Sequence, residues 1–333
     1  VTFEGVTKIN SDAYFYLPTG DTASREATGT YNAGTRGVMM GGIVAGGSTK
    51  NATIDYWTMA STGDAIDFGD CTAASGVGAG VASRVRGVNP GGFSRDTTNF
   101  DYVTIMSTGN AADFGDLPFT HSVSNDGGFS SETRGVFHQS LSTDPTTYYN
   151  IINYITISST GDAQDFGDTT YTRSQSGAVG SPTRGVWAGG YTPSNVNSMD
   201  YVTIASTGNA KDFGDLSTVL IRTGGSSNAT RGVFLGGQAP GETNAMSYIT
   251  IATTGNAQDF GDLVQAQTFC TGTSSSTRGV KVGGSDSTPG PYAPVETIEY
   301  FEIATTGNAQ NFGDLSAARA RGGTFSNGHG GLG

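Results

Sequence analysis

One motif recurs six times along this chain, and its recurrence constrains the fold more than any other feature. The motif runs, with few exceptions, aromatic-x-T-I-x-x-T-G-[ND]-A-x-D-F-G-D. It begins at Tyr56, Tyr102, Tyr154, Tyr201, Tyr248 and Tyr300. A second motif, R-G-V, alternates with it and begins at Arg36, Arg86, Arg134, Arg184, Arg231 and Arg278. The chain is therefore an array of repeats of about 47–50 residues, and each repeat contains both motifs.

The length of the repeat predicts a β-propeller. A four-stranded propeller blade takes about 40–50 residues, whereas one coil of a leucine-rich solenoid takes about 20–29. In one repeat, MSYITIAT (246–253) alternates large apolar and small polar residues, as a half-buried strand does. The TGN that follows it predicts a tight hairpin turn. We predict four strands per repeat, from the inside outward TGGSS (223–227), RGVFLGG (231–237), YITIAT (248–253) and QDFGDL (258–263).

The composition agrees with short strands joined by tight turns. Gly contributes 52 of 333 residues, and charged residues only 14%. Such a chain offers few strong helix formers and many turn formers. Hydrophobic residues at 35% and aromatic residues at 10% are enough to build a core, which argues against wholesale disorder.

The two ends of the chain predict how the ring closes. Residues 12–21 (DAYFYLPTGD) resemble a worn copy of the Tyr-led motif, and residues 321–333 resemble an inner strand followed by a decayed RGV strand, with His329 near the arginine position. We therefore predict an all-β propeller of seven four-stranded blades, with six as the alternative, in a single domain spanning 1–333. The seventh blade would combine about 1–30 with 316–333, so that N- and C-terminal strands close the ring.

The order of features within a repeat resembles that of kelch-type propellers. An apolar strand ends in Gly236-Gly237, a variable loop follows, Tyr248 leads the next strand, and Phe260 lies on the outer strand, where kelch blades usually carry Trp. The sequence TGNAxDFGDL followed by RGV is also similar to repeat proteins of marine bacteriophages, cyanophages in particular, encoded among tail or appendage genes. The resemblance covers almost the whole chain and implies a virion component, but propellers host many unrelated functions.

The repeated arginine is predicted to pair with the last aspartate of DFGD. These aspartates are Asp70, Asp116, Asp168, Asp215, Asp262 and Asp314. Because a planar guanidinium matches a carboxylate bidentately, we expect each pair to fix the geometry of its own or the adjacent blade. The repeated Tyr and Phe are expected to fill the space between blades. The glycines of DFGD and RGV are expected to permit close strand approach or a bulge.

The net charge argues against two classes of partner. The chain carries 17 basic and 29 acidic residues, which gives a net charge of −12 and a pI of about 4.5. Nucleic acid and an anionic membrane surface are therefore both disfavoured as partners. No apolar run reaches 18 residues, so no membrane insertion is predicted, and the first residues lack the pattern of a signal peptide.

The sequence carries no catalytic or metal-binding signature. His121, His138 and His329 form neither H-x-H nor H-E-x-x-H, and no G-x-S-x-G or G-x-x-x-x-G-K-[ST] motif occurs. Cys71 and Cys270 predict two buried thiols rather than a disulfide framework or a zinc site. DFGD places two acids three residues apart, unlike a calcium loop. We predict no metal, no cofactor and a non-enzymatic role; a glycan-active enzyme with converging carboxylates is the alternative.

Function is expected where the copies of the repeat differ. In a propeller, the loops between second and third strands share one rim with the connections to the next blade, and the hairpin turns share the other. The hairpin turns hardly vary here, whereas the loops of the first rim, called the variable rim below, vary greatly. Its candidate binding residues are Phe93, Arg95, Asp96, Asp144, Tyr148, Tyr149, Tyr191 and Tyr292. Aromatic faces beside polar groups are typical of sites for sugars or protein surfaces; merely tolerated surface loops are the alternative.

These observations predict a structural protein of a virion or an extracellular appendage. Its variable rim would bind a host surface glycan or a neighbouring subunit, within a homo-oligomer or a larger assembly. A purely structural capsid-decoration or filament subunit, which uses the uniform rim as its interface, is the second interpretation.

Overall fold

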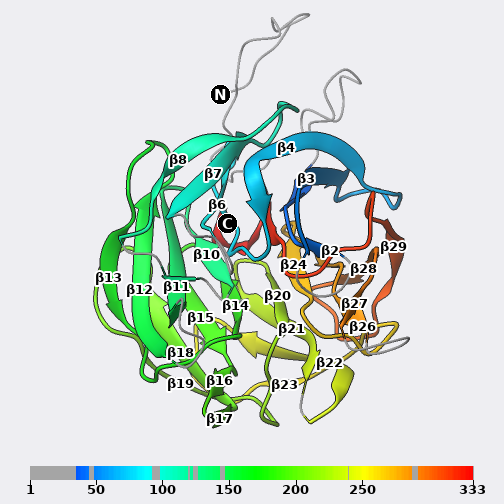
Figure 1. The fold of residues 1–333 in the computed structure, drawn as a ribbon. Coiled ribbons are helices and arrows are strands. Elements are labelled where there is room, and N and C mark those ends of the chain that lie inside the picture. Colours follow the sequence, from blue (N-terminus) through cyan, green and yellow to red (C-terminus); the bar gives the residue numbers. More distant parts are fainter. Residues whose placement is uncertain are drawn as a thin grey trace, which may run out of the picture. The chain divides into compact units, whose positions relative to one another are not determined.

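The computed structural model describes residues 35–44, 49–91, 98–118, 121–122, 127–142, 147–238, 240–286 and 292–332. All of them belong to the unit Gly34–Gly333. This unit is a β-propeller of six blades, each built on four antiparallel strands, which follow one another around the ring in Figure 1. The prediction of seven blades is wrong, and the six-bladed alternative is confirmed.

The blades are numbered here from the N-terminal side, and their strands are given from the channel outward. Blade 1 contains β30 (Gly323–Ser326), β1 (Arg36–Met40), β3 (Thr49–Thr58) and β4 (Ile66–Ser75); blade 2 contains β5 (Val81–Ala82), β6 (Arg86–Asn89), β7 (Asn99–Thr104) and β8 (Ala112–Asp116); blade 3 contains β10 (Gly128–Ser130), β11 (Arg134–Ser142), β12 (Tyr148–Thr156) and β13 (Gln164–Asp168). Blade 4 contains β14 (Gly177–Gly180), β15 (Arg184–Ala188), β18 (Ser198–Thr203) and β19 (Lys211–Asp215); blade 5 contains β20 (Gly224–Ser227), β21 (Arg231–Gln238), β22 (Glu242–Thr250) and β23 (Gln258–Asp262); blade 6 contains β24 (Thr271–Ser274), β25 (Arg278–Val282), β28 (Thr297–Glu302) and β29 (Gln310–Asp314).

Short additional strands lie on the rim. They are β2 (Ile43–Val44), β9 (His121–Ser122), and the pairs β16 (Tyr191–Thr192) with β17 (Ser194–Asn195) and β26 (Ser285–Asp286) with β27 (Ala293–Pro294).

The ring is closed by a strand from the C-terminal end. β30 pairs with β1 in antiparallel register, with Gly323 opposite Met40 and Ser326 opposite Gly37. The inner strand expected near the C-terminus is therefore present, but it completes the blade of Arg36 rather than a seventh blade.

The other parts of the predicted closure blade have different outcomes. The second strand expected after β30 does not form, because the glycine-rich end turns instead into a 3₁₀ segment, η2 (Gly330–Leu332). The worn copy at 12–21 lies outside the described residues.

Each interface between adjacent blades encloses its own hydrophobic cluster. Between blades 4 and 5, Phe213 packs with Phe234 and Ile249. The six DFGD phenylalanines are buried in this way. The repeated tyrosine stands edge-on to the phenylalanine: the ring centroids of Tyr201 and Phe213 are 6.0 Å apart and the planes meet at 79°. The repeated aromatics therefore fill the space between blades, as predicted.

The TG[ND]A segment joins each blade to the one before it. In blade 5, Gly255 N donates to Phe213 O at 2.7 Å and Ala257 N donates to Asp215 O at 2.9 Å, both on blade 4. In return, Asp215 N donates to Asn256 Oδ1 at 3.1 Å. The same three hydrogen bonds recur at every interface, including the one that joins blade 1 to blade 6 through Asp64 and Asp314. The segment was predicted to be a tight hairpin turn, and it does join two adjacent antiparallel strands. It also holds neighbouring blades together and is called the interblade latch below.

The glycine of DFGD is required by this latch. Gly214 has φ +135° and lies at the bulge where β18 and β19 shift register. A Cβ there would lie 2.6 Å from the backbone of Gly255. The expectation of a bulge and a close approach is confirmed, because a side chain at this position would push the neighbouring blade away.

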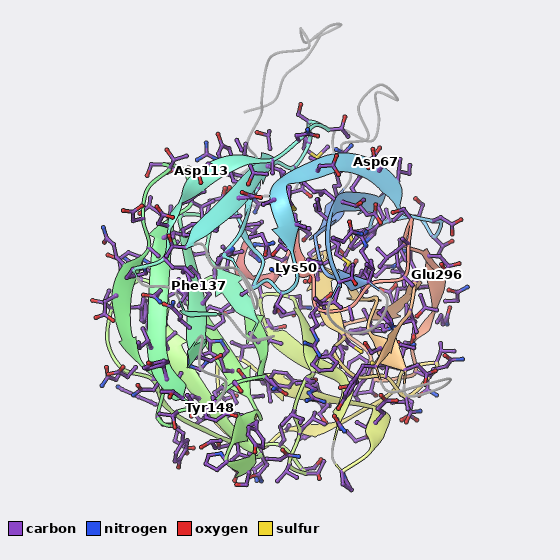
Figure 2. All side chains as sticks on the ribbon, in the orientation of Figure 1. Lys50, Asp67, Asp113, Phe137, Tyr148 and Glu296 are labelled. Carbon is purple, nitrogen blue, oxygen red and sulfur yellow. The ribbon has the colours of Figure 1, made fainter. Side chains whose placement is uncertain are left out.

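The repeated arginine does not make the predicted ion pair. Arg231 lies over the Tyr248 ring, with Cζ 4.4 Å from the centroid, and its Nη1 donates to Ile303 O at 2.9 Å on the next blade. The arginines of the other five blades repeat this arrangement. In the part of the chain that the structure describes, no ion pair joins an RGV arginine to a DFGD aspartate. The prediction was wrong because the guanidinium is engaged by the tyrosine ring of its own blade and by a carbonyl oxygen of the next blade. Figure 2 shows Asp67 and Asp113, the first acids of two DFGD motifs, on the outer strands β4 and β8.

Candidate functional site

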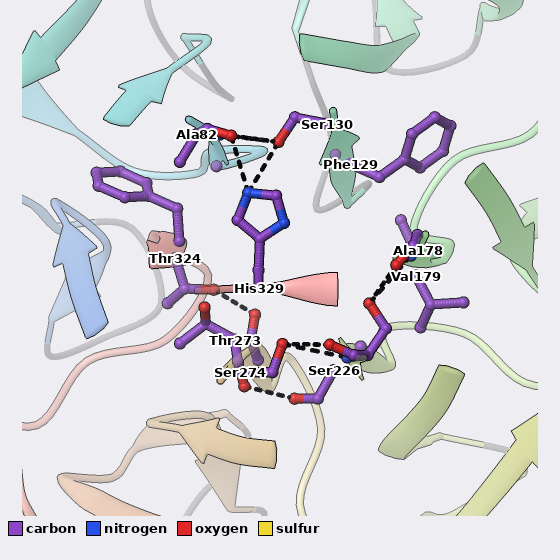
Figure 3. Close-up of a pocket in the computed structure, with 17 residues that line it drawn as sticks. Ala82, Phe129, Ser130, Ala178, Val179, Ser226, Thr273, Ser274, Thr324 and His329 are labelled. Carbon is purple, nitrogen blue, oxygen red and sulfur yellow. Dashed lines mark hydrogen bonds between the residues drawn. The ribbon is translucent and has the colours of Figure 1, made fainter. Parts of the chain in front are cut away.

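The innermost strands surround a central channel lined by small residues. Figure 3 shows one section of it, a cavity of about 50 Å³ bordered by serines and threonines. Two of these serine hydroxyls donate hydrogen bonds to the neighbouring blade: Ser227 Oγ donates to Gly180 O at 2.8 Å, and Ser274 Oγ donates to Ser227 O at 2.6 Å. This part of the channel is therefore a structural seam rather than a reactive surface.

The C-terminal segment occupies the end of the channel on the uniform rim. His329 points toward blades 2 and 3, where its Nε2 donates to Ala82 O at 2.8 Å (Figure 3). Its Nδ1 accepts from Gly331 N at 3.1 Å, which fixes the neutral tautomer. Burial lowers the pKa of His329 to about 4. The η2 segment beside it packs against β10, β14 and β20, so the channel is capped at this end.

The candidate residues of the variable rim fall into two groups. Phe93, Arg95, Asp96 and Asp144 lie outside the described residues. Tyr148, Tyr149, Tyr191 and Tyr292 are described, and all four are half-buried.

Two of these tyrosines come together on the rim between blades 3 and 4. The rings of Tyr148 and Tyr191 are 5.6 Å apart at 63°. Figure 2 shows Tyr148 near the β16–β17 hairpin that carries Tyr191. Burial raises the pKa of the Tyr148 hydroxyl, and Tyr191 adds to the effect. The carbonyl oxygen of Tyr149 instead accepts from His138 Nε2 at 3.2 Å. The pair Tyr148–Tyr191 is thus a half-exposed aromatic surface.

Tyr292 lies elsewhere, beside the mouth of the channel. Its ring meets Phe269 edge-on, with centroids 5.3 Å apart, and its hydroxyl accepts from Arg222 Nη1 at 2.7 Å. Arg222 Cζ is also 4.3 Å from the Phe269 centroid, and Arg321 Cζ is 3.5 Å from the same centroid. The structure therefore gathers Arg222, Phe269, Tyr292 and Arg321 into one group, called the channel-mouth cluster below.

The repeat brings three of these residues to the mouth through one backbone position. Gln175, Arg222, Phe269 and Arg321 each stand seven residues after the last aspartate of DFGD, and all four have positive φ, from +55° to +67°. A chain of backbone hydrogen bonds links them: Arg222 N donates to Gln175 O at 2.8 Å and Phe269 N donates to Arg222 O at 3.0 Å. Sequence analysis missed this position because it considered the loops of the rim and not the connections to the inner strands. Aligning the repeats would have revealed one position that carries Gln, Arg, Phe and Arg in four successive repeats.

Buried ion pairs elsewhere have structural roles. Arg173 pairs with Asp200 and Arg319 with Asp55, and all four side chains are buried. Asp200 also accepts from Thr170 N at 3.0 Å and Asp55 from Ser316 N at 3.0 Å. Each buried carboxylate therefore holds the segment that leaves the preceding blade, which satisfies both charges within the interface.

Burial shifts the pKa values of two further titratable groups among the described residues. Burial, then the charge of Arg173, lowers the pKa of His138 to about 3, and burial raises the pKa of Cys270 to about 11, so both groups are neutral near pH 7. Cys71 and Cys270 are buried thiols, as predicted. No group of three or more His, Cys, Asp or Glu residues with metal-binding geometry occurs among the described residues. No helix in that same part of the chain has the length and apolar character to cross a membrane.

Comparisons with known proteins add no family to this picture. No protein-family model matches the chain, and a search of curated proteins gives no match. The β-propeller fold, which suits a structural or binding role, therefore rests on the blades themselves.

Proposed function

We propose that this propeller is a non-enzymatic recognition module whose variable rim binds a surface glycan or a neighbouring subunit. One observation carries the proposal: the repeats are uniform where blades contact one another and differ on one rim. The uniform positions are accounted for by the interblade latches and the arginine–tyrosine contacts. The Tyr148–Tyr191 pair and Tyr292 lie half-exposed on the rim that differs. Tyrosines with one apolar face and one polar tip are typical of such binding surfaces.

The setting proposed for this module is a virion or an extracellular appendage, as part of a larger assembly. The support is the similarity of its repeats to those of marine bacteriophage tail and appendage proteins. Mass spectrometry of purified particles tests this directly: the chain should be present at a fixed ratio to the other structural subunits. Its absence from the particles would contradict the proposed setting.

The binding role is tested on a glycan array with three variants of the full chain. Tyr148→Ala and Tyr292→Ala each remove one aromatic surface of the variable rim. Val85→Ala is the control, because Val85 is 62% exposed on the opposite rim. We expect the unmodified chain and Val85→Ala to bind the same glycans, and at least one tyrosine variant to lose them. Binding that survives both tyrosine changes would contradict the rim assignment. No binding by any form, together with self-association in sedimentation, would favour a purely structural subunit.

A further inference from the structure

Two guanidinium groups lie against one aromatic ring at the mouth of the channel. Arg222 and Arg321 both lie over the ring of Phe269, at 4.3 Å and 3.5 Å from its centroid, so their separation is at most the sum of these distances. Phe269 itself is buried, whereas both arginines are partly exposed to solvent. The aromatic ring thus holds two like charges close together where a ligand can reach them.

Most of the N–H donors of the two arginine side chains make no hydrogen bond to a described residue. Arg222 Nε donates to Gln175 Oε1 at 2.7 Å. Its Nη1 donates to Gln238 Oε1 at 2.7 Å and to the Tyr292 hydroxyl. These three bonds fix the direction of the guanidinium and leave Nη2 without a hydrogen bond to any described residue. The Arg321 side chain lies over Phe269, and the five N–H donors of its guanidinium meet no acceptor among the described residues.

No carboxylate balances the pair among the described residues. The ion pairs there involve Arg84, Arg173, Arg278, Lys281 and Arg319, and neither Arg222 nor Arg321. Burial and then the positive charge of Arg222 lower the pKa of Arg321 to about 10, against an opposing effect of Tyr292. In a chain of net charge −12, a pair of arginines without a carboxylate is an unusual local concentration of positive charge.

We propose that the channel-mouth cluster binds the carboxylate of an acidic sugar, with Arg222 and Arg321 as its donors. The inference rests on the proposed glycan-binding function and names its ligand class. A guanidinium fork matches the two oxygens of a carboxylate, and charge-assisted bonds of this kind are the strong ones. The rest of an acidic sugar would meet groups suited to its hydroxyls: the Tyr292 hydroxyl and the amides of Gln175 and Gln238, all fixed by Arg222.

The space below the cluster also suits a small polar group. A cavity of about 60 Å³ lies in the adjoining part of the channel. Its lining includes Thr223, Cys270 and Gly322, the residues that follow Arg222, Phe269 and Arg321 in the chain. Such a volume holds a few water molecules, or part of a sugar substituent that displaces them.

The experiment is calorimetric titration of the full chain with tetragalacturonate and, as a matched ligand, its methyl ester, which keeps the sugar ring and removes the charge. The protein variants are Arg222→Gln, Arg321→Gln and Arg321→Lys, and Lys211→Gln is the control that removes one positive charge from an exposed outer strand. We expect the acid to bind and the ester to bind at least tenfold more weakly. Each Arg→Gln change should weaken binding of the acid about tenfold or more, while Arg321→Lys retains part of the affinity and Lys211→Gln changes it less than twofold.

Other outcomes overturn the site or the function separately. Equal binding of acid and ester, or full affinity in both Arg→Gln variants, would overturn the carboxylate site. Affinity retained by Arg321→Lys would show that the loss in Arg321→Gln comes from the missing charge and not from misfolding. Tight binding of hexaglutamate with none of tetragalacturonate would show that the arginines serve an acidic peptide, which also overturns the sugar assignment. If neutral glycans bind through Tyr148 alone, the recognition function stands and only this site falls.

Discussion

The repeated arginine shows how one side chain can join two blades without an ion pair. Arg231 stacks on Tyr248 of its own blade and donates to the carbonyl oxygens of Ile303 and Ala304, each at 2.9 Å, on the next blade. The DFGD aspartate contributes through its backbone: Asp215 gives its N–H to Asn256 and its carbonyl oxygen to Ala257. The charge of the arginine is therefore used at the interface, and that of the aspartate is not.

This difference predicts unequal changes in the free energy of unfolding for two conservative substitutions. Arg231→Lys loses the planar stacking and one fork of hydrogen bonds, and should lower the free energy of unfolding by about 1–2 kcal/mol. Asp215→Asn keeps the backbone bonds and should change it by no more than about 0.5 kcal/mol. Urea unfolding of both variants measures the two values. Equal destabilisation by both changes would instead support the ion pair predicted from the sequence.

Buried histidines predict a loss of stability in mild acid. The pKa of His138 is about 3 in the folded chain, because burial and the charge of Arg173 disfavour its protonated form, against an ordinary value of 6.5. Below pH 6.5 this histidine binds a proton in the unfolded chain but stays neutral in the folded chain. The free energy of unfolding therefore decreases as the pH is lowered, by about 2 kcal/mol between pH 6.5 and 5. His138→Gln should remove this part of the slope in urea unfolding at several pH values. An unchanged slope would mean that His138 is protonated in the folded chain.

At the scale of the element, the connection between third and outer strands is the unit that makes neighbouring blades cohere. TG[ND]A predicts a tight turn, because glycine and asparagine favour positive φ. The structure uses the same residues to present two N–H groups and one side-chain oxygen to the preceding DFGD. Local propensity cannot distinguish these outcomes, since the partner lies one repeat earlier in the chain.

Two glycines that meet at one interblade latch distinguish the steric cost of an added side chain from the cost of backbone strain. Gly214→Ala would place Cβ 2.6 Å from the backbone of Gly255 at a residue with φ +135°. Gly255→Ala has a comparable φ, +156°, but no atom within 4 Å of its Cβ. We expect Gly214→Ala to cost about 3 kcal/mol or more, and Gly255→Ala only the backbone strain of about 1–2 kcal/mol. Thermal and urea unfolding measure both, and equal losses would contradict the close approach.

At the scale of the whole molecule, the sequence predicts the fold class well and the number of blades less well. Period, alternation and turn residues identify the four strands of each blade, because these are local properties of one repeat. Blade count depends on which distant strands pair, and β30 joins β1 across nearly the whole chain. Sequence analysis counted the worn ends as an extra blade, whereas the inner strand of blade 1 was the one still missing.

The candidate site divides in the same way. The rim tyrosines could be chosen from the variable loops, and Tyr148 with Tyr191 do come together. The channel-mouth cluster could not be assembled from one loop, because Arg222, Phe269 and Arg321 come from three successive connections that the ring brings side by side. Their proximity is a property of closure, not of any repeat.

Closure is the claim on which both fold and site depend, and amide hydrogen exchange of the full chain tests it most directly. Among the described residues β30 pairs with one strand, β1, so its amides are protected only if the ring is closed. We predict that peptides covering Gly323–Ser326 exchange as slowly as those covering Gly224–Ser227, the equivalent inner strand of blade 5. Exchange of the C-terminal peptide within seconds, with the blade 5 peptide still protected, would contradict the closed six-bladed ring.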